Sequence, residues 1–111
     1  MAGKTILIQG ETLGRGDEKL GEIVMSNFLS NLVNSKDRPA RLVFLNTGVK
    51  LVAEGSWALA HLKKLEEQGV VVLACGTCLD FFEIKDKIKV GKVGNMAAVI
   101  GFMMNTDTVC L

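Results

Sequence analysis

The sequence predicts an α/β domain with a mainly parallel sheet of about five strands and helices on both faces. Short apolar runs alternate with segments in which apolar residues recur at helical spacing. One run, Val70–Ala74, is apolar throughout, as in a strand that is buried on both faces of a parallel sheet. The helical segments between the runs have lengths that suit right-handed crossovers between parallel strands.

The first half of the chain is expected to hold two strands and a helix. Residues 4–9 form a strand, which a glycine-bearing loop over residues 10–16 follows. Asp17 can then accept hydrogen bonds at the start of an amphipathic helix. Residues 41–45 form a second strand, and residues 46–55 a loop with a helical turn.

The second half repeats the alternation. Ser56 is expected to cap a helix that ends at Gly69, and the strand over residues 70–74 then leads to Cys75. The last part should form a helix, an extended segment, a helix and a strand, over residues 79–87, 88–93, 95–104 and 108–111.

Composition and charge exclude several classes of protein. A chain of 111 residues fits one domain over residues 1–111. Its 13 basic and 12 acidic residues are interspersed, which argues against a nucleic-acid-binding surface. No signal peptide is evident, and no segment approaches the ~20 apolar residues that a membrane span needs. We therefore expect a cytoplasmic protein that contacts neither membranes nor nucleic acid.

The chemistry is expected at Cys75-Gly76-Thr77-Cys78, where the apolar strand meets the next helix. Backbone N–H groups at such a junction favour an anion, so a cysteine pKa can fall from its usual ~8.5 toward neutrality. Gly76 allows close approach of the backbone, and the Thr77 hydroxyl can donate a hydrogen bond to a sulfur anion. This pattern indicates a nucleophilic or sulfur-carrying thiolate.

Three other interpretations of these cysteines stay open. Cys75 can be a small buried side chain without chemistry. The Cys-x-x-Cys spacing is also typical of thioredoxin-like redox sites, although Pro39 precedes the second strand rather than facing the cysteines. Zinc would need four ligands, and only His61 and Cys110 are obvious additions. We therefore predict no metal and no cofactor.

Loops that follow parallel strands share one edge of a sheet, which is where ligands bind. The loops over residues 10–17 and 46–55 should therefore lie beside the cysteines. Their expected contributions to the pocket, or to stabilising an anion there, come from Gly14, Arg15, Asn46 and Gly48. A plain connection between strand and helix is the alternative for the first of these loops.

Several separated motifs carry a family resemblance. In order they are Leu-Gly-Arg-Gly-Asp (13–17), Asn-Thr-Gly-Val-Lys-Leu (46–51), Glu-Gly-Ser (54–56), Cys-Gly-Thr-Cys-Leu-Asp-Phe-Phe (75–82) and Gly-Asn-Met (94–96). Over nearly the whole chain they resemble the DsrE-like family of sulfur-relay proteins, closest to the branch that forms the C-terminal half of the selenium-metabolism protein YedF. Glu83 departs from the glycine that is usual in this branch.

The resemblance implies a flavodoxin-like three-layer fold, a homo-oligomer, and a cysteine that carries sulfur as a persulfide. Cys75 matches the family's sulfur-accepting position, and Cys78 matches a second cysteine of the branch. The TusA-like domain that precedes this branch in YedF is missing from the sequence, which leaves a piece of a longer protein and a stand-alone member as the two possibilities. The expected partner is a TusA-like or other sulfur-carrier protein.

Two functional hypotheses follow. In the first, the protein is a sulfur carrier or sulfurtransferase that relays sulfur, or selenium, between partner proteins. The Cys75 thiolate attacks an incoming persulfide, and Cys78 assists or resolves it by forming a disulfide. In the second, the domain binds a small ligand or a protein without catalysis, and the cysteines are structural. A thiol–disulfide redox protein is a further alternative.

Overall fold

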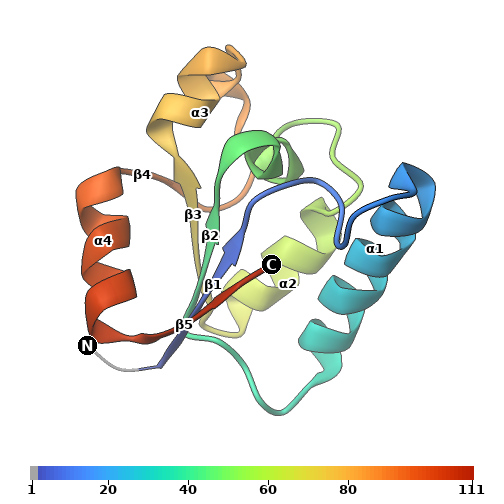
Figure 1. Cartoon of the computed structure of the whole chain (residues 1–111), viewed down its shortest axis with the longest axis horizontal. Helices are drawn as coiled ribbons and strands as arrows, with labels where there is room; N and C mark the ends of the chain where they lie inside the picture. Colours follow the sequence, from blue (N-terminus) through green and yellow to red (C-terminus); the bar gives the residue numbers. More distant parts are fainter. Residues whose placement is uncertain (1–2) are drawn as a thin grey trace.

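A computed structural model, which describes residues 3–111, shows a five-stranded sheet between two layers of helices (Figure 1). All strand pairs are parallel, and the strand order is β4-β3-β2-β1-β5. The strands are β1 (Lys4–Ile8), β2 (Arg41–Phe44), β3 (Val71–Cys75), β4 (Lys92–Gly94) and β5 (Asp107–Cys110). The α-helices are α1 (Glu18–Asn34), α2 (Leu59–Glu67), α3 (Gly76–Phe81) and α4 (Met96–Asn105), and the 3₁₀ segments are η1 (Asn46–Val52) and η2 (Lys85–Lys87). The three-layer parallel fold predicted from the sequence is confirmed.

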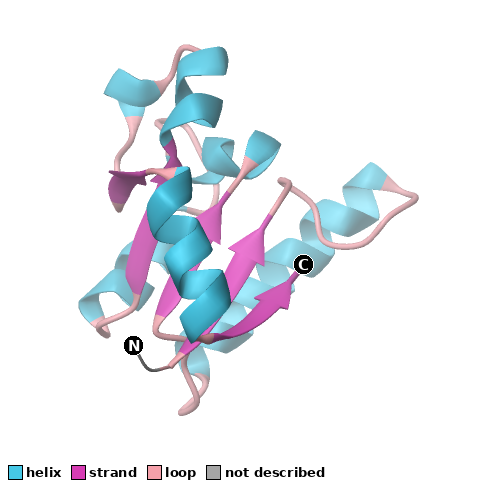
Figure 2. Ribbon diagram, turned by 60° about the vertical axis from the view of Figure 1, so that its left-hand side comes forward, coloured by secondary structure: helices cyan, strands magenta, loops and turns pink. Residues whose placement is uncertain are grey.

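The direction of the crossovers determines which face each helix covers. From β1 to β3 the chain steps one way across the sheet, with α1 and α2 on one face (Figures 1 and 2). It then returns from β4 to β5 through α4, which lies on the opposite face, as right-handed crossovers require. Flavodoxin has the strand order 2-1-3-4-5, which differs from the order in this sheet. The chain therefore shares with flavodoxin the three-layer arrangement of helices and parallel sheet, and not the strand order. No helix within residues 3–111 is both long and apolar enough to cross a membrane.

The two faces of the sheet have cores of different size. Under α1 and α2, a large cluster includes Ile8, Leu29 and Phe44, all fully buried. Under α4, the fully or nearly fully buried residues are Leu7, Val43 and Val99. The expectation that the third strand is buried on both faces is therefore wrong in part. Val71 is 48% exposed, because α4 packs over β1 and β2 and leaves part of β3 uncovered.

A buried arginine joins the end of α4 to the sheet. The Arg41 guanidinium donates a hydrogen bond to the Thr5 hydroxyl over 2.8 Å. Its central carbon lies 4.6 Å from the centroid of the Phe102 ring, a cation–π contact. The Thr5 hydroxyl also lies 2.8 Å from that of Thr106, at the C-cap of α4. These contacts hold α4 in place where its apolar packing is limited.

The predicted helix starts are confirmed at α1 and corrected at α2. The Asp17 carboxylate accepts a hydrogen bond from the Leu20 N–H over 2.9 Å, as expected of a cap. Ser56 does not cap α2, which begins only at Leu59. Its hydroxyl instead accepts from the Ala58 N–H over 3.0 Å, so it stabilises the turn that leads into the helix.

The predicted helix over residues 79–87 is also corrected, because α3 begins at Gly76 and ends at Phe81. Glu83 takes the left-handed backbone conformation, with φ of 57°. Its N–H bonds to the Asp80 carbonyl over 3.1 Å, and the Ile84 N–H bonds to the Leu79 carbonyl over 3.0 Å. This pair of hydrogen bonds is a Schellman motif, which ends a helix and favours glycine at the left-handed residue.

Replacing Glu83 by glycine is expected to stabilise the fold by about 1 kcal/mol, because a side chain makes the left-handed conformation costly by roughly that amount. The free energy of unfolding, measured in urea, checks this. Glu83→Ala is the matched control, since it removes the carboxylate and keeps the Cβ atom. An equal gain in both variants would assign the effect to the charge of Glu83 and contradict the backbone explanation.

Candidate functional site

The Cys-x-x-Cys motif lies where β3 passes into α3, as predicted. Cys75 is the last residue of β3 and the N-cap residue of α3, and Gly76, Thr77 and Cys78 open the helix. A Cβ atom on Gly76 would lie 3.2 Å from the Val93 side chain and 3.3 Å from the Gly94 carbonyl oxygen. The glycine therefore lets the first turn of α3 pack closely against β4.

The two cysteines differ in how an incoming molecule can reach them. Cys75 is 7% exposed and belongs to the large core. Cys78 is half-buried and lines an open hollow of about 280 Å³. The other residues that line this hollow are Asn46, Thr77, Phe81 and Phe82. A molecule in the hollow meets the Cys78 side chain first, although the family resemblance assigns the sulfur-accepting position to Cys75.

Hydrogen bonds favour a thiolate at Cys75. Burial by itself raises the pKa of Cys75, but hydrogen bonds from the Cys78 N–H and thiol and from the Thr77 N–H and hydroxyl more than offset it, so the pKa lies below the usual value. The pKa of Cys78 is raised by burial, by its hydrogen bond to Cys75 and by repulsion from the Cys75 thiolate. When the pair loses its first proton, the negative charge therefore lies on Cys75 and the remaining proton stays on Cys78.

Asn46 supplies a further hydrogen bond to this pair. Its backbone N–H donates to the Cys78 sulfur over 3.1 Å. Asn46 adopts a left-handed conformation, with φ of 52°, which asparagine tolerates better than most residues. Its side-chain oxygen accepts from the Thr47 N–H over 2.8 Å and holds this turn of η1 in place. The sequence-based expectation that Asn46 lies beside the cysteines agrees with this geometry.

Two aromatic residues that the sequence analysis left out of the site form a wall of the hollow. The Phe81 and Phe82 rings meet edge to face, with centroids 5.2 Å apart. The Lys50 ammonium lies 4.5 Å from the Phe82 centroid and 3.8 Å from the Glu11 carboxylate. The sequence signal was the Phe-Phe pair, which follows Cys78 by three and four residues, the spacing that places side chains on one helix face.

Three of the expected pocket residues lie elsewhere. Gly14 and Arg15 line a separate hollow of about 350 Å³ on the loop after β1. Gly48 is buried, and a Cβ atom there would lie 2.5 Å from the Ile8 carbonyl oxygen, so it serves the packing of η1 against β1. The structure therefore does not bring these three residues to the hollow at Cys78.

The positions of the remaining candidate residues bear on the zinc and thioredoxin alternatives. Within residues 3–111, no three His, Cys, Asp or Glu side chains gather as a metal site would require. Cys110 lies on β5, which β1 and β2 separate from β3. Pro39 precedes β2, at the opposite edge of the sheet from the cysteines. Cys110 therefore cannot complete a zinc site with the pair, and Pro39 does not face the cysteines as the proline of a thioredoxin-like site does.

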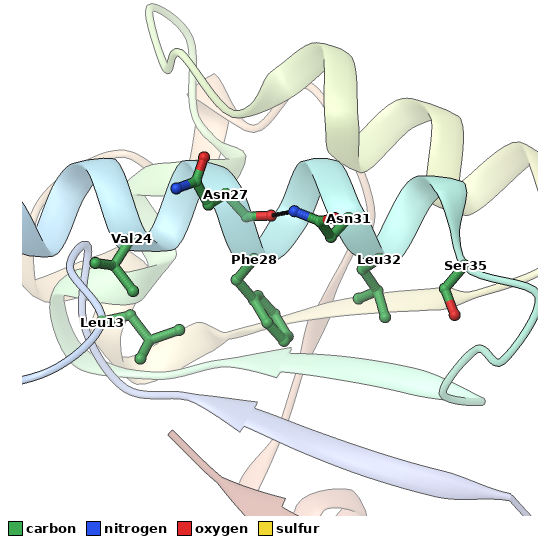
Figure 3. A pocket seen from close by; sticks show the side chains of 7 residues that line it. All are labelled: Leu13, Val24, Asn27, Phe28, Asn31, Leu32 and Ser35. Atoms are coloured by element: carbon green, nitrogen blue, oxygen red, sulfur yellow. Dashed lines mark hydrogen bonds between the residues drawn. The ribbon is translucent and has the colours of Figure 1, made fainter.

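A larger hollow, of about 490 Å³, lies along α1. Figure 3 shows that Val24, Phe28 and Leu32 from α1 and Leu13 from the preceding loop turn toward one another there. Its polar lining consists of amides and a hydroxyl, with the Asn31 side-chain amide donating to the Asn27 carbonyl over 2.7 Å. It holds no thiol and no titratable side chain that could activate its hydroxyl, so the chemistry of this chain points to the cysteines.

Fold and site together define a three-layer α/β protein with a dithiol at the carboxyl edge of a parallel sheet. The model of the DsrE/DsrF-like family matches residues 24–109, and the chain belongs to this family. A search of curated proteins found no match.

Two solved structures share the fold. MTH1491, a protein of unknown function from Methanobacterium thermoautotrophicum, is similar with a TM-score of 0.72 and 16% identity over 97% of both chains. The ychN protein from E. coli is similar with a TM-score of 0.70 and 17% identity over 100% of both chains.

Removing the Thr77 hydroxyl is expected to raise the pKa of Cys75. In a Cys110→Ser background, Thr77→Val keeps the shape of the side chain and removes a donor to the thiolate. The ultraviolet absorbance of the thiolate, followed as a function of pH, should show the first deprotonation at higher pH in this variant.

Thr77→Ser, which keeps the hydroxyl, is the matched control and should titrate close to the parent. A serine variant that titrates like the valine variant would contradict a role for the hydroxyl.

The lowered pKa of Cys75 also makes the stability of the fold depend on pH. Because folding lowers the pKa of Cys75, its thiolate contributes stability above the pKa of an unfolded cysteine, and this contribution is lost as the pH falls through the folded-state pKa.

Proposed function

We propose that this protein is a sulfur carrier that receives sulfane sulfur as a persulfide on the Cys75–Cys78 pair and passes it to a partner protein. Membership in the DsrE/DsrF-like family implies sulfur relay. The observation that carries the proposal is the arrangement of two thiols, of which Cys75 is buried and has a lowered pKa, whereas Cys78 opens on a hollow. A structural pair would need neither the lowered pKa of Cys75 nor access to Cys78.

The difference in exposure makes Cys78 the residue that receives sulfur. As its sulfur attacks the terminal sulfur of a persulfide, R–S–SH, the Cys78 proton passes to the Cys75 thiolate along their hydrogen bond. The S–S bond of the donor breaks, and the donor leaves as R–S⁻. Cys78 then carries –S–SH, and the added sulfur occupies the hollow beside Phe81 and Phe82.

The partner in this relay is proposed to be a TusA-like protein or another sulfur carrier, which presents its own cysteine at the hollow. Phe81 supports a protein partner, because this residue is 80% exposed and lines the hollow beside Cys78. Exposed aromatic side chains at a reactive site are typical of protein interfaces. The same exchange chemistry applies to selenium, which we include in the proposal as an alternative cargo.

We further propose that the protein forms a homo-oligomer through α4. This helix has no charged residue, and its exposed face carries Met96, Ile100, Met103 and Met104. Val71 on β3 adds to the same side of the sheet. Large contiguous apolar patches are rare on monomeric proteins and mark surfaces that bind other proteins.

The sulfur-carrier proposal predicts which variant retains the sulfur. In a Cys110→Ser background, Cys75→Ser treated with glutathione persulfide is expected to keep one added sulfur that a reductant removes, detected by intact-mass spectrometry. The hydrogen bond to the Cys75 sulfur and the repulsion from the Cys75 thiolate both raise the pKa of Cys78, and this variant lacks them. Cys78 is therefore expected to deprotonate at lower pH and to react by itself. The matched variant Cys78→Ser is expected to gain no sulfur.

An adduct on Cys78→Ser but not on Cys75→Ser would move the carrier role to Cys75. If neither variant gains sulfur and neither thiol reacts faster than a model thiol, the sulfur-carrier proposal fails. The structural or ligand-binding interpretation of the cysteines would then stand.

The oligomer proposal predicts a loss of association when a charge is placed on α4. Ile100→Glu puts a carboxylate in the centre of the exposed apolar face and is expected to reduce the molar mass in solution to that of one chain, measured by light scattering after gel filtration. Ile23→Glu is the matched control, since Ile23 is exposed on α1 at the opposite face. A monomeric parent protein, or equal dissociation in both variants, would contradict the interface.

A further inference from the structure

We propose that the cysteine pair also reduces the sulfur it has received, releasing it as hydrosulfide and closing a Cys75–Cys78 disulfide. This activity differs from relay, because the sulfur leaves as a free product at a lower oxidation state. It rests on the proposed function, since the sulfur must first arrive on Cys78. The juxtaposition that carries it is the buried Cys75 sulfur at the end of β3 and, hydrogen-bonded to it from the first turn of α3, the Cys78 sulfur that lines the hollow.

The contacts of Cys78 determine which sulfur of the persulfide Cys75 can attack. The inner sulfur of a Cys78 persulfide is the present Cys78 sulfur, which receives the Asn46 N–H over 3.1 Å and shares a hydrogen bond with Cys75. The outer sulfur extends into the hollow beside Phe81 and Phe82. Attack on the outer sulfur would only move the cargo, whereas attack on the inner sulfur releases it. The geometry favours the inner one.

The release step balances without a further reactant. The Cys75 thiolate forms a bond to the inner sulfur, the bond between the inner and outer sulfurs breaks, and the outer sulfur leaves as HS⁻ with the bonding electron pair. Cys75 and Cys78 are each oxidised to half of a disulfide, and the sulfane sulfur is reduced by two electrons. The proton that Cys75 took during uptake passes to the departing donor thiolate, which restores the Cys75 thiolate.

Two features favour this step chemically. Hydrogen bonds from the Thr77 N–H and hydroxyl and from the Cys78 N–H, none of which needs the Cys78 thiol proton, lower the pKa of the attacking sulfur, and only the thiolate attacks. Hydrogen sulfide is a stronger acid than an alkyl thiol, so hydrosulfide leaves more readily than a cysteine thiolate would. Cys110 cannot replace Cys75, because it lies on β5 beyond β2 and β1.

The proposed activity stops after one turnover unless the disulfide is reduced again. A small dithiol or a dithiol reductase is the required co-reactant, and it would attack the disulfide at Cys78, the sulfur that faces the hollow. The same cycle would release selenide from a bound selenium atom. A protein that keeps both cysteines therefore delivers either bound sulfur or free sulfide, according to whether a partner or Cys75 reacts first.

The test compares protein that holds both Cys75 and Cys78 with protein that lacks the Cys75 thiol. Cys110→Ser protein is reduced, freed of reductant and mixed with one equivalent of glutathione persulfide. The expected result is close to one sulfide released per chain, measured with a sulfide electrode, and a disulfide seen by intact mass as the loss of two hydrogens. Cys75→Ser in the same background is expected to keep its sulfur and release none, and Cys75→Ala repeats this with an apolar side chain.

Reduction of the spent Cys110→Ser protein with dithiothreitol, followed by removal of the dithiothreitol, is expected to restore the release of one sulfide from a new equivalent of persulfide. If that protein instead keeps a stable persulfide, like the Cys75 variants, the release activity is overturned while the sulfur-carrier proposal stands. Equal sulfide release from protein with and without Cys75 would also overturn it. Failure of every variant to take up sulfur would overturn both proposals.

Discussion

The parallel pairing of β2 and β3 is the constraint on which the site depends. In this register Phe44 lies beside Ala74, so the chain leaves both strands at the same level of the sheet. Asn46, two residues after Phe44, then presents its N–H to Cys78, four residues after Ala74. A slip of one residue would turn the side chains of one strand to the other face and separate these groups.

The parts of the structure that follow from local patterns could be predicted from the sequence. Apolar periodicity located β1, α1 and β2 closely, and the run before Cys75 placed the motif at the carboxyl end of a strand. The prediction that Asn46 lies near the cysteines came from a general rule, that loops after parallel strands share an edge. The same rule failed for Gly14 and Arg15, because their loop lines a separate hollow together with Leu111, the residue that follows β5.

Other features depend on tertiary contacts that no local pattern contains. The spacing of Cys75 and Cys78 does not tell which sulfur turns toward the core and which toward the hollow. That distinction follows from how α3 packs against η1 and β3. The early end of α3 was hidden in the local pattern, because glutamate is an ordinary helix residue. The sequence signal for it was the glycine that the resembling branch usually has at position 83, where Glu83 takes the left-handed backbone conformation. The partial exposure of β3 also depends on a tertiary contact, because α4 packs over β1 and β2 and leaves part of one face of β3 uncovered.

Gly48 shows how far from the sulfur the reactivity of the pair can be controlled. The absence of its side chain lets η1 lie against the carbonyl of Ile8, where any Cβ atom would come within 2.5 Å. Two residues earlier, the same turn orients the N–H that meets Cys78. Substitutions at position 48 would shift that donor and alter the acidity of a thiol that they never touch. Variation at this glycine is thus a route by which relatives of this chain could tune how readily they take up and surrender sulfur.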